Sequence, residues 1–369
     1  MSAAGATARA AVLEKFGEPI VLREFEVPAA APGDLVVASS YGGICGTDLH
    51  LQQGHLAIPI PLVLGHEGLG VVRDLGEGVT SDANGAPLAV GDTVMWASSI
   101  SCGQCVPCRA HREPTLCENR QTYGVNRAVG AGPSLSGSWA EAIYLRQGTT
   151  VVKVPDGVDH VAAMAFACAG PTMVHALRER RPVVVGEVVV VQGSGPVGLA
   201  AAAMAQLAGA ARVIIVGGPR ERLDLAERAG IGHHHVDILT EGAAAALDRV
   251  IELTGGRGAD LVIECAGVPA AVGQGLRLVR RSGSYLIVGQ YTDAGDTMIN
   301  PHQIVYRQLD VVGSWAFTGA HLMEYVNLLP DLISRFDLRS LVTTFPLDET
   351  QRAVEQVASG AVMKAVLVN

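Results

Sequence analysis

A glycine-rich turn in the middle of the chain separates an apolar run from an alanine-rich run. The apolar run, residues 183–191, is rich in β-branched side chains, and the alanine-rich run covers residues 199–209. Between them stands a G-x-G-x-x-G pattern made by Gly193, Ser194, Gly195, Pro196, Val197 and Gly198. This order predicts a strand, a tight turn and a helix, which is the arrangement that binds the pyrophosphate of a dinucleotide at a helix N-terminus.

Each glycine of this turn has a separate physical task. We expect Gly193 to permit the tight turn, Gly195 to let a pyrophosphate approach the backbone, and Gly198 to let helix and strand pack closely. The alternative is an ordinary glycine turn of an α/β protein. A second apolar strand at residues 212–217 supplies the context that favours the dinucleotide site.

The rest of the chain divides into a β-rich part and an alternating part. Residues 9–40 and 69–97 have the apolar alternation and turn residues of short antiparallel strands. From the glycine turn to residue 289, strand-like and helix-like runs alternate, which predicts a doubly wound parallel sheet. A helical segment at 159–181 is interrupted at residues 168–172, a further helix is expected at 320–329, and a last strand at 362–368 is expected to rejoin the β-rich part. A length of 369 residues also favours two domains.

Four of the seven cysteines lie close together in sequence. An odd total is not typical of a disulfide framework. The spacing C-x2-C-x2-C-x8-C allows four thiolates to enclose one tetrahedral zinc ion and leave no position open. We therefore predict a structural zinc site at Cys102, Cys105, Cys108 and Cys117.

A second group of candidate ligands precedes that loop. Cys45 and His66 carry donor atoms that suit zinc, and Glu67 is a third or a replaceable ligand. Asp48 is suited to hold the second nitrogen of the His66 ring. A single buried cysteine or histidine is usually an ordinary core residue, and only the combination favours a metal. We interpret Cys265 as core packing, although by composition it is as good a third ligand as Cys168.

Charge and hydropathy exclude several classes of partner. The formal net charge is −9, which disfavours nucleic acid and anionic membrane surfaces. No apolar stretch reaches the roughly 18 to 20 residues that span a bilayer. The first residues lack the apolar core of a secretory signal. We expect a soluble, cytoplasmic protein. A tract of three histidines at residues 233–235 is interpreted as a solvated turn rather than a metal site.

These features together resemble the zinc-containing medium-chain alcohol dehydrogenases, over almost the whole chain. The resemblance depends on motifs that occur in the order of the family: Cys45-Gly46-Thr47-Asp48-x-His50, Gly65-His66-Glu67, the four-cysteine loop, Cys168-x3-Thr172 and the glycine turn. It implies a GroES-like catalytic domain formed by residues 1–170 and 313–369. It also implies a Rossmann dinucleotide-binding domain at 171–312.

The resemblance also assigns roles to single residues. It implies a catalytic zinc held by Cys45, His66 and Cys168 in addition to the structural zinc. Thr47 and His50 would relay protons. Thr172 would lie near the nicotinamide, and Lys364 would bind the cofactor phosphates. Relatives of this kind form homodimers or homotetramers, so we expect a homo-oligomer.

Two departures from the family pattern stand out. The last spacer of the four-cysteine loop has eight residues, one more than is usual, which we expect to change only the shape of the loop. The second strand of the dinucleotide domain ends at Gly217 without the carboxylate that holds the ribose of NAD. Arg220 and Arg222 follow and can attract a 2′-phosphate, although both also suit a solvated helix start. This pattern favours NADP over NAD.

The implied activity is hydride transfer between a small alcohol, or its aldehyde or ketone, and NAD(P). A zinc-free quinone or enoyl reductase with the same fold is one alternative, but such an enzyme has no need for Cys45, His66 and Cys168. A non-catalytic NAD(P)-binding structural or regulatory protein is the other. The intact ligand and relay residues disfavour it.

Overall fold

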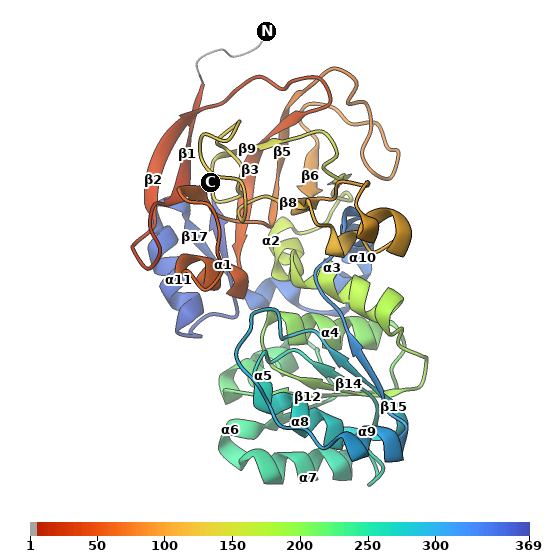
Figure 1. Ribbon diagram of the computed structural model, residues 1–369. Helices are drawn as coiled ribbons and strands as arrows, with labels where there is room; N and C mark the ends of the chain where they lie inside the picture. Colours follow the sequence, from red (N-terminus) through yellow and green to blue (C-terminus); the bar gives the residue numbers. More distant parts are fainter. Residues whose placement is uncertain (1–5) are drawn as a thin grey trace. The chain divides into compact units, whose positions relative to one another are not determined.

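The computed structural model describes residues 6–369, which form two compact units (Figure 1). The first unit comprises residues Met1–Cys168, Thr318–Pro330 and Val342–Asn369, and the second comprises Ala169–Phe317 and Asp331–Leu341. The resemblance implied a catalytic domain of residues 1–170 and 313–369, whereas residues 169–170, 313–317 and 331–341 of that range fall in the second unit. There the backbone N–H of Asp337 donates to the carbonyl of Ala229.

The first unit is built mainly on antiparallel strand pairs, although β17 pairs with β18 in parallel. A seven-stranded sheet has the order β10-β6-β5-β3-β18-β17, with β9 also paired to β3. A three-stranded sheet has the order β2-β1-β4, and β7 pairs with β8. The strands are β1 (Thr7–Leu13), β2 (Val21–Glu26), β3 (Leu35–Ile44), β4 (Leu62–Val63), β5 (Gly68–Leu75), β6 (Thr93–Trp96), β7 (Ser99–Ile100), β8 (Gln121–Thr122), β9 (Ala142–Leu145), β10 (Val151–Lys153), β17 (Val342–Pro346) and β18 (Lys364–Val368).

The last strand of the chain returns to the first unit, as predicted. Strand β18 pairs antiparallel with β3, with Ala365 opposite Ile44 and Val368 opposite Tyr41. This register brings Lys364 next to the end of β3, where the first candidate ligand follows. One core cluster of the unit joins segments far apart in the sequence, since Ile44 and Leu51 pack with Ala365 and Leu367.

Short helices complete the first unit. They are α1 (Gly46–Gln52), α2 (His160–Ala163), a 3₁₀ turn at Met164–Phe166 and α11 (Thr350–Ala358). The four-cysteine loop contains a π-helical turn at Pro107–His111 and a 3₁₀ turn at Pro114–Leu116. Helix α10 (Gly319–Arg335) contains Pro330, at which the chain passes from the first unit to the second.

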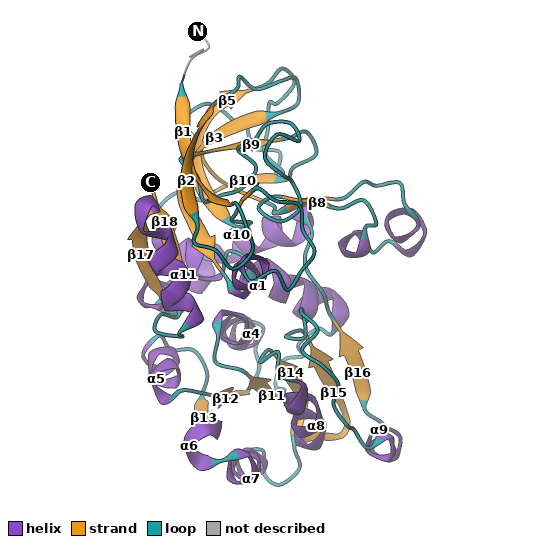
Figure 2. Ribbon diagram, turned by 60° about the vertical axis from the view of Figure 1, so that its left-hand side comes forward, coloured by secondary structure: helices purple, strands orange, loops and turns teal. Residues whose placement is uncertain are grey.

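The second unit contains the predicted doubly wound sheet. Six strands in the order β13-β12-β11-β14-β15-β16 are all parallel. Figure 2 shows α4 and α5 on one side of this sheet and α7 and α8 on the other. The elements are α3 (Ala169–Val174), β11 (Val188–Gln192), α4 (Pro196–Leu207), β12 (Arg212–Gly217), α5 (Arg220–Arg228), β13 (His234–Asp237), α6 (Ile238–Glu241), α7 (Ala243–Leu253), β14 (Ala259–Glu264), α8 (Pro269–Leu278), β15 (Val279–Ile287), α9 (Pro301–Arg307) and β16 (Asp310–Gly313).

Three local expectations are wrong. The first strand of the parallel sheet begins only at Val188, and Val185 before it is 80% exposed. The interruption of the helical run is shorter than expected, since Ala167 and Cys168 form a turn and residues 169–172 already belong to helix α3. The histidine tract is not a turn, because two of its residues begin strand β13 and Nδ1 of His233 accepts a hydrogen bond from the backbone N–H of Val213.

No single helix within residues 6–369 is long and apolar enough to cross a membrane. Two consecutive helical segments, His160–Phe166 and Ala169–Arg180, are together long and apolar enough for a membrane span, but they are bent by 50° at the break between them.

Candidate metal and dinucleotide sites

Three of the predicted zinc ligands meet in the first unit. Donor atoms of Cys45, His66 and Cys168 all lie within 4.8 Å of one another, and Sγ of Cys45 is 3.2 Å from Nε2 of His66. Two sulfurs and one imidazole nitrogen form a donor set that suits zinc. The structure therefore brings Cys168 into this cluster, whereas Cys265 lies outside it.

A single carboxylate holds two of these ligands. Oδ2 of Asp48 accepts a hydrogen bond from the backbone N–H of Cys45 at 2.9 Å, and Oδ1 lies 3.1 Å from Nδ1 of His66. This contact leaves Nε2 of His66 as the nitrogen that faces the sulfurs. A carboxylate on the second nitrogen of a ligating histidine sets its tautomer and orientation, so Asp48 takes the position predicted from sequence.

Local backbone geometry explains why these side chains converge. Cys45 is the extended N-cap residue of α1, and Asp48 lies in the first turn, where a carboxylate is favoured by the helix dipole. Before His66, Gly65 has a φ of +92°, and a Cβ there would overlap Ser138 and Trp139. A residue with a side chain at position 65 would displace His66 from the cluster.

The three clustered side chains influence each other's protonation. A hydrogen bond from the Cys168 thiol holds the pKa of Cys45 well below its ordinary value. Burial would lower the pKa of His66, but the Cys45 thiolate and Asp48 outweigh burial and raise it well above its ordinary value. One sulfur of the cluster is thus already prepared to act as a thiolate, which is the form that binds metal.

The two predicted residues Glu67 and Lys364 contact each other. The Lys364 ammonium forms an ion pair with Oε1 of Glu67 and donates to the carbonyl of Ile44 at 3.2 Å. Both side chains are buried, and Oε2 of Glu67 has no hydrogen-bond partner within the described residues. Burial would lower the pKa of Lys364, but the Glu67 carboxylate outweighs it and raises that pKa. Glu67 is not among the clustered donors, and the phosphate-binding role of Lys364 stays a prediction.

Replacing Lys364 with methionine is expected to reduce the stability of the first unit. The change leaves the Glu67 carboxylate buried without a counter-charge, which costs about 3 to 5 kcal/mol in comparable buried pairs. Chemical denaturation followed by circular dichroism measures the difference. The double variant Lys364→Met with Glu67→Gln removes the orphaned charge and is the matched control. It should recover a large part of the loss, and equal stabilities of wild type and Lys364→Met would contradict this account.

The four-cysteine loop also gathers its donors. Sulfur atoms of Cys102, Cys105, Cys108 and Cys117 all lie within 4.8 Å of one another. Sγ of Cys102 accepts hydrogen bonds from the backbone N–H groups of Gln104 and Cys105, both at 3.4 Å, and these lower the pKa of its thiol to about 6. Four sulfur donors this close together could enclose one zinc ion, and the longer last spacer does not separate them.

The glycine turn of the second unit has the shape of a phosphate cradle. Gly193 has a φ of +114°, and a Cβ on Gly198 would collide with the carbonyl oxygen of Gly193. Gly195 is the N-cap residue of α4, and a Cβ on it would meet no atom within 4 Å. Pro196 begins the helix, where its missing N–H costs nothing. The backbone at Gly195 is thus open among the described residues, as the approach of a pyrophosphate to this helix N-terminus requires.

A serine of this turn forms hydrogen bonds to the backbone that follows strand β12. Oγ of Ser194 donates to the carbonyl of Gly218 at 3.0 Å and accepts from its backbone N–H at 3.1 Å. A Cβ on Gly217 would lie 2.7 Å from the same Oγ. The end of strand β12, which carries no carboxylate, therefore requires glycine at position 217.

Two arginines follow this strand end. Arg220 forms ion pairs with Asp224 and Glu227 on its own helix, and burial lowers the pKa of Arg222.

A buried glutamate in the second unit was not predicted from sequence. Glu264 is fully buried at the end of β14, and its carboxylate accepts hydrogen bonds from the backbone N–H groups of Ala266, Gly267 and Gly289. It therefore ties together two loops at the carboxyl edge of the sheet, where ligands of such folds bind. A charged residue in the apolar run 261–265 is the signal that identifies it.

Helices α1 and α3 carry the three remaining predicted residues. Thr47 and His50 lie three positions apart on α1, so their side chains share one face of that helix. Thr172 lies in α3 of the second unit.

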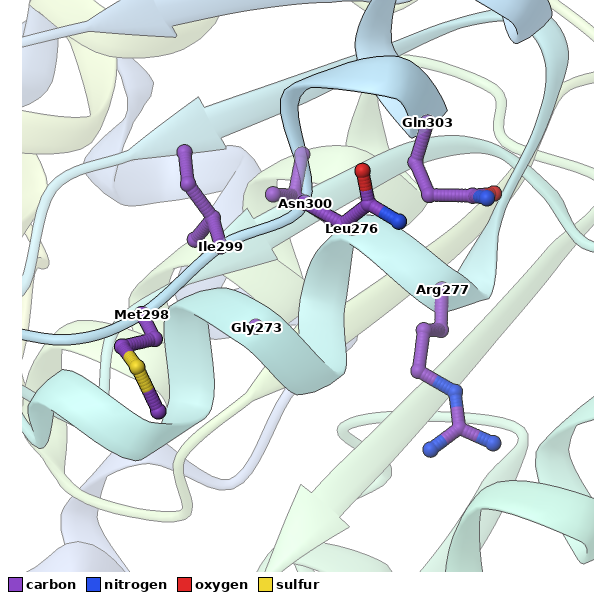
Figure 3. Close-up of a pocket in the computed structure, with 7 residues that line it drawn as sticks. All are labelled: Gly273, Leu276, Arg277, Met298, Ile299, Asn300 and Gln303. Atoms are coloured by element: carbon purple, nitrogen blue, oxygen red, sulfur yellow. The ribbon is translucent and has the colours of Figure 1, made fainter.

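A pocket of about 400 Å³ in the second unit contains none of these residues. It lies between helix α8 and the segment that enters α9, and Arg277 is its one charged lining residue (Figure 3). The residues that line it are Gly273, Leu276, Arg277, Met298, Ile299, Asn300 and Gln303.

Comparison with known proteins agrees with both halves of this architecture. Residues 31–156 match the family model of the alcohol dehydrogenase GroES-like domain, and residues 196–333 match that of the zinc-binding dehydrogenases. The chain is 34% identical to 5-exo-hydroxycamphor dehydrogenase of Pseudomonas putida, over 98% of each chain. The chain therefore belongs to the zinc-containing medium-chain alcohol dehydrogenase family.

Solved structures lead to the same conclusion. An alcohol dehydrogenase from Thermotoga maritima is 33% identical, with a TM-score of 0.93 over 99% of this chain and 100% of the other. A zinc-binding dehydrogenase from Sinorhizobium meliloti, bound to NADP, is 29% identical, with a TM-score of 0.85 over 99% and 100% of the two chains. The fold class predicted from sequence is confirmed. The protein is a zinc-dependent oxidoreductase that transfers hydride between an alcohol or its carbonyl product and a nicotinamide cofactor.

Proposed function

We propose that this protein oxidises a secondary alcohol, or reduces the corresponding ketone, at a zinc ion held by Cys45, His66 and Cys168. The observation that supports this most strongly is the contrast between the two clusters. Within residues 6–369, the four-cysteine loop offers four sulfurs, whereas the second cluster offers three donors. Three protein ligands leave a coordination position for substrate.

The bound zinc would supply a Lewis acid that lowers the pKa of the alcohol. The chain's own residues have the remaining tasks. Asp48 holds the backbone of Cys45 and the ring of His66, which keeps both donors in place. Thr47 and His50, on one face of α1, take the alcohol proton and carry it away from the site. Lys364 keeps the Glu67 carboxylate neutralised beside these ligands.

We propose NADP rather than NAD as the preferred cofactor. Strand β12 ends at Gly217, where Ser194 Oγ would obstruct a side chain, so no carboxylate occupies the position that would repel a 2′-phosphate. Arg220 and Arg222 supply positive charge close by in sequence, and the Sinorhizobium meliloti relative was solved with NADP bound. Thr172 and the Gly193–Gly198 turn complete the proposed cofactor contacts.

The choice of a secondary alcohol is supported by the Pseudomonas putida relative, whose name specifies a hydroxyl on a ring carbon of camphor. A panel of cyclic secondary alcohols, polyols and primary alcohols, assayed with NAD and with NADP, tests both parts of the proposal. We expect the highest kcat/KM for a cyclic secondary alcohol with NADP. A preference for primary alcohols would contradict the substrate class, and a preference for NAD would contradict the cofactor.

The homodimer or homotetramer and the cytoplasmic location stay predictions. Analytical ultracentrifugation of the purified protein measures the first.

A further inference from the structure

A second histidine contacts the proposed relay residue. Nδ1 of His50 lies 3.1 Å from Nδ1 of His55, and the two ring centroids are 5.4 Å apart with the planes tilted by 45°. At that distance one Nδ1 carries the hydrogen and the other accepts it. The two imidazoles are therefore joined by a hydrogen bond that either ring can donate.

The backbone after helix α1 brings His55 back to His50. The N–H of Gln53 donates to the carbonyl of Leu49, and the N–H of His55 donates to the carbonyl of His50 itself, at 3.0 Å each. Gly54 has a φ of +77°, a conformation that favours glycine, and its N–H donates to the carbonyl of Leu51 at 3.0 Å. The contact between the rings is thus supported by a defined turn.

The two rings differ in their surroundings. His50 is partly buried, whereas His55 is exposed to solvent. Burial and the positive charge of a protonated His55 lower the pKa of His50, while the Cys45 thiolate raises it. These are the titratable groups that act on His50 among the described residues. A proton on His50 is accordingly less stable than on an ordinary histidine and has an exposed acceptor next to it.

We propose that His55 is the outer member of the proton relay and transfers the proton between His50 and bulk water. The proposal depends on the proposed function of His50. During alcohol oxidation the substrate proton reaches His50, the Nδ1–H of His50 passes its proton to Nδ1 of His55, and His55 releases a proton to water. No electrons move in these steps, and the hydride leaves separately to the nicotinamide. During ketone reduction the same steps run in reverse. His55 touches neither the substrate nor the cofactor in this proposal. It acts through His50 and is therefore not itself a catalytic residue.

Two variants of the full-length, zinc-loaded enzyme test this relay. His55→Phe keeps an aromatic ring beside His50 but removes the nitrogen, and His55→Ala removes the ring. Gln53→Ala, an exposed position in the same turn, is the matched control. Proton release during a single turnover is followed with a pH indicator in dilute buffer, together with kcat/KM between pH 6 and 9. Histidine NMR titration of the protein without substrate measures the pKa of His50 independently of activity.

We expect both His55 variants to slow proton release about 3- to 10-fold, less than the roughly 100-fold that loss of a direct acid–base group causes. Added imidazole should restore the rate of His55→Ala. Neutral His50 is the form that accepts the proton during oxidation, so the loss of repulsion from His55 should raise the pKa of His50. The acid limb of kcat/KM should therefore move to higher pH in His55→Phe. Gln53→Ala should match the wild type.

Wild-type proton release and an unchanged His50 pKa in both variants would overturn the proposal. A lower melting temperature without either effect would show that His55 is merely structural, which also overturns it. If His50→Ala has wild-type proton release, the relay itself is absent. Failure of the wild-type enzyme to oxidise any alcohol would overturn the proposed function, and this result is seen before any variant is compared.

Discussion

Replacing Cys45 with alanine is expected to lower kcat/KM by about a thousandfold or more. The change removes one of the three donors that lie within 4.8 Å of one another. The two remaining donors would no longer hold the zinc ion where it contacts the substrate. A metal that polarises a substrate oxygen contributes several kcal/mol to the transition state, and about 4 kcal/mol corresponds to a factor of a thousand. Steady-state kinetics with a good alcohol substrate measures the loss.

The Cys45 variant should lose turnover at the metal centre and keep its ability to bind the cofactor. Binding of the nicotinamide cofactor, followed by fluorescence or calorimetry, should stay close to that of the wild type because the glycine turn belongs to the second unit. Cys265→Ala is the matched control, since this cysteine belongs to neither metal cluster. Turnover of Cys45→Ala at the level of Cys265→Ala would reject the assignment of the ligands.

Replacing Cys105 with serine should lower stability far more than it lowers catalysis. The four-cysteine loop has little regular structure, with one π-helical turn and one 3₁₀ turn, so the metal supplies much of its cross-linking. Loss of a structural metal belongs to the class of changes that cost on the order of 4 kcal/mol, which corresponds to a fall in melting temperature of about 10 °C.

Arg109→Ala provides the control for that loop, because Arg109 is exposed and supplies no donor. It should change stability by no more than about 0.5 kcal/mol. Differential scanning calorimetry with zinc analysis on the same samples separates the two effects. A Cys105→Ser protein that has lost one zinc and still melts like the wild type would count against a structural role for this site.

Much of the second unit could be predicted from sequence because its signals are local. Alternation of apolar runs and helical runs predicts a parallel sheet, and the glycine spacing specifies one strand–turn–helix. The start of the first strand could not be predicted, since Val185 is as apolar as Val190 but is exposed and lies outside the sheet. Apolar character alone does not distinguish a strand from the loop that leads into it.

The candidate site could be predicted only in part, because its members are far apart in sequence. The four-cysteine loop is a local motif and needs no fold to be identified. Cys168 is different: composition makes Cys265 an equal candidate, and only the resemblance to a family selected the ligand that the fold brings to His66. The ion pair of Glu67 with Lys364 joins residues 297 positions apart and depends on the register of β18 beside β3. The ring contact of His55 depends on how two side chains are oriented within a turn, and Gly54 favours the turn without specifying the contact.

The central claim is that Cys45, His66 and Cys168 hold one zinc ion. The most direct test is a crystal structure of the zinc-loaded enzyme with anomalous diffraction recorded on both sides of the zinc absorption edge. We expect a zinc peak among these three side chains, about 2.3 Å from each sulfur and about 2.0 to 2.1 Å from Nε2 of His66. A crystal that shows the zinc of the four-cysteine loop but no peak among Cys45, His66 and Cys168 would contradict the claim.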